Sequence, residues 1–413
     1  MTNELKGACI LGQSGGPTAV INASAYGIID EALHQPNITR VLGADHGITG
    51  VLNDILYDMS LEDAWELSLL RNTPSSELGS CRYKIADPDM DDTDFKKILA
   101  IFKKYNVRYF FYNGGNDSMD TCEKISRFMA NSGWECRVIG VPKTIDNDLA
   151  GTDHCPGFGS AAKYIATSCM ELAKDAVVYP TGQITVVEIM GRHAGWLAGS
   201  AALATKFGSG PDLVYLPERD FDTERFLERV RDVFSQKGKC FIAVSEGLHF
   251  ADGSFVSEAK VSASDGFGHA QLGGLALRLG DLIRERMGVK VRAIELSLLQ
   301  RCGAHLASQT DLDEAELAGR TAVREAVSGQ SGKMVALERT VENGVYSCKT
   351  RLVDLTVCAN AEKKVPADWI TPSGDFVTDA FIDYVLPLIQ GEADIQKFNG
   401  LPRYARLKKI RCE

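Results

Sequence analysis

Two short polar segments of this chain follow apolar runs and contain residues suited to phosphate chemistry. The segment GGNDS at 114–118 follows the run 109–112, and PKTIDND at 142–148 follows the run 138–141. Glycines just past a strand let backbone N–H groups approach a phosphate closely. Carboxylates in the same place can bind a metal ion or accept a proton. Together the two segments predict phosphoryl transfer.

Asp146 and Asp148 are the candidate proton acceptors of the second segment. In an extended stretch alternate side chains share a face, so the two carboxylates would lie together and one could act as a general base. An Asx-rich turn is a common alternative, and the segment by itself favours a catalytic role only slightly. The segment alone therefore leaves a structural and a catalytic interpretation open.

A third candidate phosphate loop is GQSGGP at 12–17, which follows an apolar run and precedes an amphipathic segment. Glycines there would let backbone N–H groups reach an anion, and the start of a helix adds partial positive charge. The spacing matches neither the P-loop nor the dinucleotide fingerprint. A plain tight turn remains an equal alternative.

Charged side chains follow later apolar runs as well. Arg192, in MGRHAGW at 190–196, could bind a phosphate through two parallel hydrogen bonds. Glu246, in SEG at 245–247, could accept hydrogen bonds from sugar hydroxyls, or could simply begin a helix. Arg301 offers another cation, although an isolated arginine is usually a surface residue.

Alternating strands and helices must position these groups. Strands are predicted from apolar runs that each end near a glycine or a polar motif, at 8–11, 109–112, 138–141, 184–189 and 241–244. Helices are predicted between them, for example at 19–33, from 161 onward and at 311–328. This alternation indicates a parallel sheet with helices on both faces and ligands at the carboxyl ends of the strands.

The chain length and the distribution of glycines predict two lobes. The 413 residues exceed what one hydrophobic core usually supports. Gly151, Pro156, Gly157 and Gly159 cluster near the expected boundary. Residues 335–355 predict strands joined by a turn at 343–344, and the tail from 385 to 413 offers no motif.

The composition excludes several classes of protein. A formal charge of −10 argues against general nucleic-acid binding. No run of about 18 apolar residues predicts a membrane span, and the first residues lack a signal-peptide pattern. Eleven cysteines without a C-x-x-C pair indicate reduced thiols, so we expect a cytoplasmic protein with no membrane partner.

Seven ordered pieces closely resemble the phosphofructokinases over residues 7–310. They are GGPTAVINA at 15–23, LGSCR at 78–82, GGNDS at 114–118, PKTIDND at 142–148, VVEIMGRHAGW at 186–196, SEG at 245–247 and LQR at 299–301. The resemblance implies two Rossmann-like α/β lobes with parallel-rich sheets and an active site in the cleft between them. It also implies Mg²⁺-assisted transfer of a phosphoryl group to O1 of fructose 6-phosphate.

The resemblance assigns a ligand to each lobe. The donor-phosphate lobe is expected to comprise residues 1–158 and about 301–350, and the sugar-phosphate lobe residues 159–300 and part of 351–413. Gly15, Arg82 and Lys143 match the donor site. Asn116 stands at the metal position, which is usually an aspartate; an amide oxygen can still ligate Mg²⁺, with less charge.

The resemblance also assigns the acceptor side. Asp146 matches the general base that removes the proton from the 1-hydroxyl. Sugar-phosphate contacts are implied for a larger set: Thr144, Ile145, Met190, Gly191, Arg192, Glu246, Arg292, Leu298 and Arg301. Arg292 matches an arginine that reaches in from a neighbouring subunit, so a homodimer or homotetramer is expected. Leu298 and Gln183 replace a histidine and an arginine of bacterial members.

Two positions discriminate between donors. ATP-using relatives carry glycines where this chain has Asp117 and Lys143, and the pyrophosphate-dependent branch carries these residues. A carboxylate at 117 would project negative charge into the space of a nucleotide's α-phosphate, and burying two unpaired anions together is costly. Lys143 could pair with Asp117 and stabilise charge on the leaving phosphate. The resemblance therefore predicts pyrophosphate, with Asp146, Asp117 and Lys143 as the catalytic set.

Two other functions stay open at this point. Some relatives are non-catalytic subunits that have lost the base, but Asp146, Arg192, Glu246 and Arg301 are all present here. Another sugar phosphate, such as sedoheptulose 7-phosphate, could replace fructose 6-phosphate. Effectors and the role of the segment after 310 are not predicted by the sequence.

Overall fold

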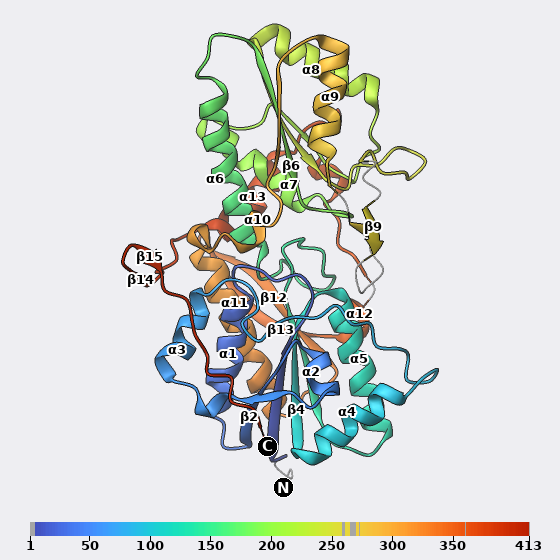
Figure 1. Cartoon of the computed structure of the whole chain (residues 1–413), viewed down its shortest axis with the longest axis vertical. Coiled ribbons are helices and arrows are strands. Elements are labelled where there is room, and N and C mark those ends of the chain that lie inside the picture. The colour runs from blue at the N-terminus through green and yellow to red at the C-terminus, as the bar shows by residue number, and fades with distance from the viewer. Residues whose placement is uncertain (1–4, 258–260, 265–269, 272, 360, 413) are drawn as a thin grey trace.

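The computed structural model describes residues 5–257, 261–264, 270–271, 273–359 and 361–412. It contains two α/β units, each a sheet covered by helices, that lie end to end (Figure 1). A seven-stranded sheet lies in the lower half of the view and a four-stranded sheet in the upper half. Both sheets are parallel-rich, as expected. The carboxyl ends of their strands carry the predicted motifs.

The larger sheet has the strand order β13-β12-β5-β4-β1-β2-β3. Its strands are β1 (Gly7–Gln13), β2 (Ile38–Ala44), β3 (Leu56–Asp58), β4 (Val107–Gly114), β5 (Arg137–Pro142), β12 (Lys333–Glu342) and β13 (Val345–Asp354). The five central strands run parallel, whereas the edge strands β3 and β13 are antiparallel to their neighbours. This arrangement places the ends of β1, β4 and β5 side by side.

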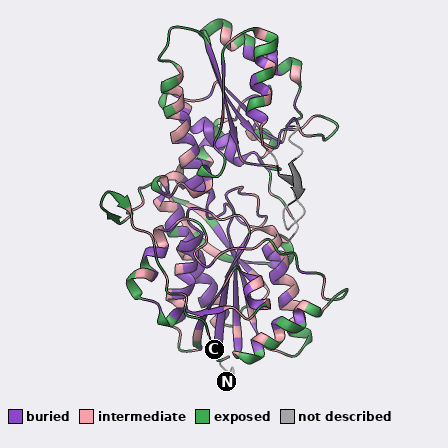
Figure 2. Cartoon of the chain, viewed as in Figure 1, coloured by how far each residue is buried: buried purple, intermediate pink, exposed green. Residues whose placement is uncertain are grey.

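Helices cover both faces of this sheet (Figure 2). Alternate side chains of each strand point into a hydrophobic core on one face or the other, so both faces must be covered. Leu11 and Phe111 face α1 (Ile21–Leu33) and α11 (Gln309–Val327), while Ile10 and Phe110 face the opposite core. That second core is covered by α4 (Thr93–Lys104), α5 (Asn116–Asn131) and the short helices α2 (Ile48–Leu52) and α12 (Leu355–Cys358). Strands buried on both faces explain the continuous apolar runs of the sequence.

Close packing of α1 on α11 depends on two glycines. A Cβ atom at Gly27 would lie 2.3 Å from the carbonyl oxygen of Glu316, and one at Gly319 would lie 2.2 Å from that of Ser24. Both distances are far inside van der Waals contact, so any side chain would push the helices apart. Helix α11 follows the LQR motif in the chain, so its packing on α1 holds the segment just after Arg301 in place.

The smaller sheet has the order β11-β6-β8-β7 and is wholly parallel. Its strands are β6 (Gln183–Ile189), β7 (Leu213–Tyr215), β8 (Lys239–Ser245) and β11 (Val291–Glu295). One face packs on α6 (Phe158–Ala176) and α7 (Trp196–Ser200), and the other on α8 (Thr223–Lys237) and α9 (Leu275–Met287). The ends of β6 and β8 carry the MGR and SEG motifs.

The remaining elements are short. They are α3 (Ala64–Leu69), α10 (Leu299–Cys302), α13 (Asp379–Val385), β9 (Val261–Ser264), β10 (Ala270–Gln271), β14 (Lys397–Phe398), β15 (Leu401–Pro402) and the 3₁₀ helices Met59–Leu61, Leu70–Asn72, Ala201–Phe207, Ala304–Leu306, Ala367–Trp369 and Leu386–Ile389. No helix of the described residues is long and apolar enough to cross a membrane.

The chain after β13 visits both sheets. Helix α13 packs in the core of the four-stranded sheet, through Phe381 and Val385. The tail then returns to the seven-stranded sheet, where Ala405 is buried and the amide of Cys412 donates to the carbonyl of Leu56 at 2.9 Å. This path could not be predicted, since the tail contains no motif.

The predicted elements lie at the expected places, with small shifts at their ends. The first helix begins at Ile21 rather than 19, and α6 begins at Phe158 rather than 161. The hairpin β12–β13 turns at Asn343–Gly344 as expected, with both residues at positive φ. The boundary between lobes near residue 158 and the ligand of each lobe stay predictions.

Candidate active site

The GQSGGP loop after β1 is the point at which three cationic side chains converge. Gly15 has φ +75°, and the Nζ of Lys143 donates to the carbonyl of Gly16 at 2.7 Å. A Cβ atom at Gly16 would lie 3.2 Å from Nη1 of Arg301 and 3.7 Å from Nη2 of Arg82. The loop is therefore surrounded by positive charge of the kind that suits a phosphate, and its role as a donor site stays a prediction.

The predicted LGSCR segment lies directly beside this loop. Ser14 and Cys81 form an isolated parallel bridge, and the amide of Gly15 donates to the carbonyl of Cys81 at 3.0 Å. The hydroxyl of Ser80 donates to the carbonyl of Gly15 at 2.6 Å. These contacts bring Arg82, the next residue, to the loop although almost 70 residues separate the two motifs.

The TIDND segment forms a turn at the end of β5. The amide of Asp146 donates to Oγ1 of Thr144 at 3.1 Å, and Asn147 has φ +55°. The expectation of an extended stretch is wrong here, since the left-handed residue reverses the chain between the two carboxylates. Ile145 is buried, whereas Asp146 and Asp148 are half-buried.

Asp146 stands at the electrostatic centre of the site. Burial raises the pKa of its carboxyl, and Lys143, Arg192, Arg301 and Arg82 each act to lower it. Lys143 and Arg192 follow strands of the two sheets, Arg301 lies in α10, and Arg82 belongs to the LGSCR segment. A carboxylate in this setting is held next to an anion site and remains able to accept a proton.

Lys143, one of the cations around Asp146, is buried. Burial lowers the pKa of its ammonium to about 8, with Arg82 and Arg301 acting in the same direction and Asp146 and Asp148 opposing them. A lysine with this pKa loses its charge readily. A bound anionic ligand would raise the pKa and so keep the ammonium charged.

The expected pairing of Lys143 with Asp117 does not occur in the part of the chain that the structure describes. Asp117 lies in the first turn of α5 and is half-buried. The ammonium of Lys143 instead donates to the Gly16 carbonyl. Lys143 is buried against the glycine loop, where an ammonium without an acceptor would cost free energy. The nearby Gly16 carbonyl supplies that acceptor.

Asn116 and Asp148 face each other at the predicted metal position. One end of the Asn116 amide contacts the carbonyl oxygens of Ala361 and Cys358, at 3.1 and 3.2 Å, which identifies that end as the nitrogen. The other end, the oxygen, lies 3.4 Å from Oδ2 of Asp148. In this orientation two oxygen atoms face each other, and a cation between them would stabilise the arrangement, so the pair fits Mg²⁺.

Burial and the charge of Asp146 raise the pKa of Asp148 to about 7, and Lys143 opposes them.

The described residues that could together hold a metal elsewhere are His154, Glu314 and Cys348. There Nε2 of His154 lies 2.7 Å from Oε2 of Glu314, a hydrogen bond that already satisfies both groups.

The ends of β6 and β8 carry Met190–Arg192 and Glu246, which are predicted sugar-phosphate contacts. The amide of Gly191 donates to Oε1 of Glu246 at 3.3 Å, and the amide of Met190 donates to Oε1 of Gln300 at 3.2 Å. Burial raises the pKa of Glu246 to about 7, opposed by the Gly191 amide and by Arg192. The structure thus brings the MGR, SEG and LQR motifs into one group.

Gln300 was not among the predicted site residues. Its position directly before Arg301 in the LQR motif was the available signal, and its buried side chain links the Met190 backbone to the carbonyl of Ser297. Arg292 and Leu298 are placed differently from the other predicted residues. Arg292 pairs with Asp175 at 3.1 Å, and Leu298 is 53% exposed.

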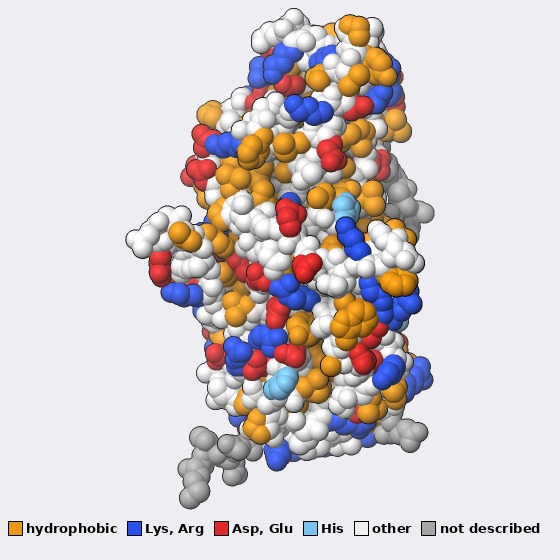
Figure 3. All heavy atoms as spheres, turned by 90° about the vertical axis from the view of Figure 1, so that its left-hand side faces the viewer, with side chains coloured by type: hydrophobic (Ala, Val, Ile, Leu, Met, Phe, Trp, Pro, Cys, Tyr) orange, Lys and Arg blue, Asp and Glu red, His pale blue; other side chains and the backbone are white. Residues whose placement is uncertain are grey.

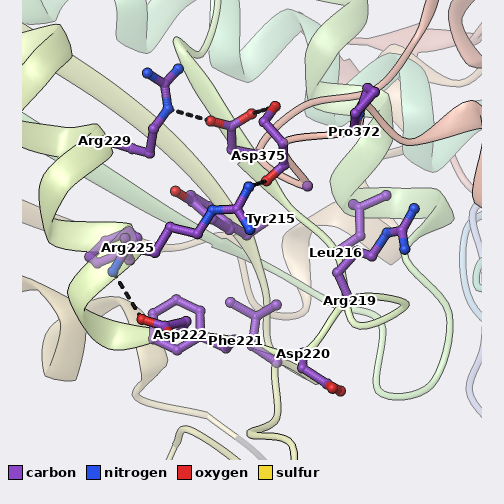
Figure 4. A pocket seen from close by; sticks show the side chains of 14 residues that line it. Tyr215, Leu216, Arg219, Asp220, Phe221, Asp222, Arg225, Arg229, Pro372 and Asp375 are labelled. Carbon is purple, nitrogen blue, oxygen red and sulfur yellow. Dashed lines mark hydrogen bonds and ion pairs between the residues drawn. The ribbon is translucent and has the colours of Figure 1, made fainter.

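A separate pocket lies between α8, the end of β7 and the segment 372–375 (Figure 4). Its arginines have partners within the chain. Arg225 donates to the carbonyl of Ser373 at 2.7 Å, and Arg229 donates to Asp375 at 2.6 Å. These contacts join the C-terminal segment to α8 and do not involve the group around Asp146.

Comparison with known proteins agrees with the fold and the motifs. The phosphofructokinase family model matches residues 8–324. A pyrophosphate–fructose 6-phosphate 1-phosphotransferase of Halomonas elongata is 43% identical over 97% of this chain and 96% of its own length. The enzyme of the same name from Xanthomonas campestris is 43% identical over 99% of this chain and 97% of its own length.

A solved structure gives the same result. The pyrophosphate-dependent phosphofructokinase of Nitrosospira multiformis superposes with a TM-score of 0.89, at 38% identity, over 99% of this chain and 98% of that one. Sequence, motifs and architecture therefore agree over nearly the whole length. The chain belongs to the phosphofructokinase family.

Proposed function

We propose that this chain transfers a phosphoryl group from pyrophosphate to O1 of fructose 6-phosphate, giving fructose 1,6-bisphosphate and phosphate. The convergence of Lys143, Arg82 and Arg301 on the Gly15–Gly16 loop, next to Asp146, supports this proposal. The relatives that match over nearly their whole length carry the same activity in their names. Pyrophosphate and the sugar ester are close in energy, so the reaction is expected to run in both directions.

In this mechanism Asp146 removes the proton from the 1-hydroxyl as the oxygen attacks the phosphorus atom. Lys143 and Arg82 stabilise the negative charge of the donor phosphates and of the leaving phosphate. Glu246 and the Met190–Arg192 segment bind the sugar phosphate, with Thr144 and Arg301 beside them. The bound sugar is thereby oriented with its hydroxyl toward Asp146.

Asn116 and Asp148 would hold Mg²⁺ in this proposal. The ion would neutralise donor phosphate charge, as it does for phosphoryl donors in general. The facing oxygen atoms of the two residues support this assignment.

The proposed donor follows from Asp117 and Lys143. Although the two side chains do not pair, Asp117 still places a carboxylate at the start of α5, next to the glycine turn. Lys143 places a buried ammonium on the first glycine loop. A small tetra-anion would gain the lysine charge and avoid the carboxylate, whereas a nucleotide would need the space that it occupies.

We further propose that the chain acts as a homo-oligomer. Arg292 lies on the edge strand β11, and its partner Asp175 lies at the end of α6. Apolar side chains gather on the upper half of the face shown in Figure 3. Val177 and Val178, just after α6, and Leu299, in α10, are exposed apolar residues. Sedimentation equilibrium should show a dimer or tetramer; a monomer at micromolar concentration would contradict this proposal.

Asp146→Asn should lower kcat by about 10²–10⁴-fold, because the amide cannot accept the proton. The Michaelis constants should change little, since the side chain keeps its size and position. Steady-state kinetics measures both effects. The matched control is Asp375→Asn, which removes a buried carboxylate paired with Arg229 outside the site and should leave kcat unchanged. Equal losses in both variants would contradict the role of Asp146.

Purified protein should turn over fructose 6-phosphate with pyrophosphate and not with ATP. Activity with ATP and none with pyrophosphate would reject the proposed donor. The double variant Asp117→Gly with Lys143→Gly should lose most pyrophosphate turnover, because it removes the ammonium that stabilises the leaving phosphate. It need not gain ATP turnover, since a nucleotide pocket must also exist.

The rate should fall at alkaline pH because Lys143 loses its charge. Its pKa is lowered to about 8, so the ammonium is charged below that pH and neutral above it. We therefore expect kcat/KM for pyrophosphate to decline above about pH 8. In Lys143→Arg the cation does not titrate in this range, so the decline should disappear. An identical decline in both proteins would assign it to another group.

A further inference from the structure

Asn147 lies between the two carboxylates of the site and turns its own side chain into the protein. It is fully buried and has φ +55°, a left-handed conformation that asparagine adopts more readily than most residues. Its Oδ1 accepts from the amide of Cys155 at 3.0 Å, and its Nδ2 donates to the hydroxyl of Tyr384 at 3.0 Å. The direction of Asp146 and Asp148 therefore depends on how firmly Asn147 is held.

Lys363 approaches the same residue from the C-terminal segment. Its backbone amide donates to the carbonyl of Asp148 at 2.7 Å, next to an isolated bridge between Leu149 and Glu362. Its Nζ donates to the carbonyl of Asp153 at 2.6 Å and to Oδ1 of Asn147 at 3.4 Å. One lysine thus binds both ends of the loop that follows the candidate base.

Tyr384, on α13, completes the contact with the loop. Its hydroxyl accepts from Asn147 and donates to the carbonyl of Asp153 at 2.7 Å. Its ring packs on Trp196 at a centroid distance of 5.3 Å, and the guanidinium of Arg339 lies 4.6 Å from the ring centroid. The hydroxyl is thereby oriented by groups on both sides and has little freedom to move away.

Both residues are anchored on Trp196, at the start of α7 in the four-stranded layer. The indole Nε1 donates to the carbonyl of Lys363 at 2.9 Å, and the ammonium of Lys363 lies 5.2 Å from the indole ring. Trp196 follows the MGR motif by only a few residues. The same contacts therefore join the Asp146 loop of one sheet to the sugar-side motif of the other.

We propose that Lys363 and Tyr384 are positioning residues that hold Asn147 and thereby orient Asp146 and Asp148. Neither side chain is among the groups that shift the pKa of Asp146, and the ammonium of Lys363 attracts Asp153 and Asp148 instead. Both residues therefore act on the loop rather than on substrate. This role rests on the proposed phosphoryl transfer, and it assigns a function to the segment after β13, for which the sequence offers no motif. Figure 1 shows α13 next to α7, between the two sheets.

The test compares Tyr384→Phe and Lys363→Met with Tyr346→Phe. Tyr346 is the matched control because its hydroxyl also donates to a partly buried network nearby, through Glu314 at 2.5 Å, but has no contact with Asn147. We expect kcat to fall roughly 10–100-fold in the first two variants, as for a displaced catalytic group. The Michaelis constants for both substrates should stay within about twofold, because no substrate contact is lost.

Thermal unfolding separates positioning from a loss of stability. Tyr384→Phe should be fully folded at the assay temperature, so a lower kcat there comes from a misplaced Asp146 and not from unfolded protein. Tyr346→Phe should keep both its kcat and its fold. Unchanged kcat in Tyr384→Phe, or equal changes in the control, would overturn the inference. Inactivity of the unaltered protein with pyrophosphate would instead reject the proposed function.

Discussion

The site depends on positive charge that converges on the half-buried carboxylate of Asp146. Lys143, Arg82, Arg192 and Arg301 come from separate segments, and each would be unfavourable if buried without compensating charge. The carboxylate supplies part of that compensation in the free protein. In the proposed function, multiply charged phosphates would supply the rest. The fold must therefore hold these segments in place before any ligand arrives.

Parallel sheets satisfy this requirement because the carboxyl ends of their strands meet at one edge. The ends of β1, β4 and β5 bring the glycine loop, Asn116 and the TIDND turn together, and the ends of β6 and β8 bring the sugar-side groups. The C-terminal segment then crosses from one sheet to the other. Lys363 and Tyr384 both contact Asn147, so the turn that carries Asp146 is supported from a part of the chain distant in sequence.

Sequence reasoning predicted what local patterns determine. Apolar runs identified the central strands, and the ordered motifs identified the family, since both are readable over short windows. The predicted pairing of Lys143 with Asp117 is not found among the described residues, because the buried ammonium donates to the Gly16 carbonyl instead. The extended form of the TIDND segment was wrong because Asn147 is left-handed, and no single residue type requires that conformation. The roles of Lys363 and Tyr384 depend on contacts across more than 200 residues, which no local pattern encodes.

A crystal structure of Asp146→Asn with pyrophosphate and fructose 6-phosphate would show directly whether Asp146 is placed to act as the base. We expect residue 146 to lie within about 2.6–3.2 Å of the sugar 1-hydroxyl. We also expect Lys143 and Arg82 to contact the donor phosphates, with Asn147 still bound by Tyr384. A sugar bound with another hydroxyl at residue 146, or a donor away from Lys143, would contradict the account.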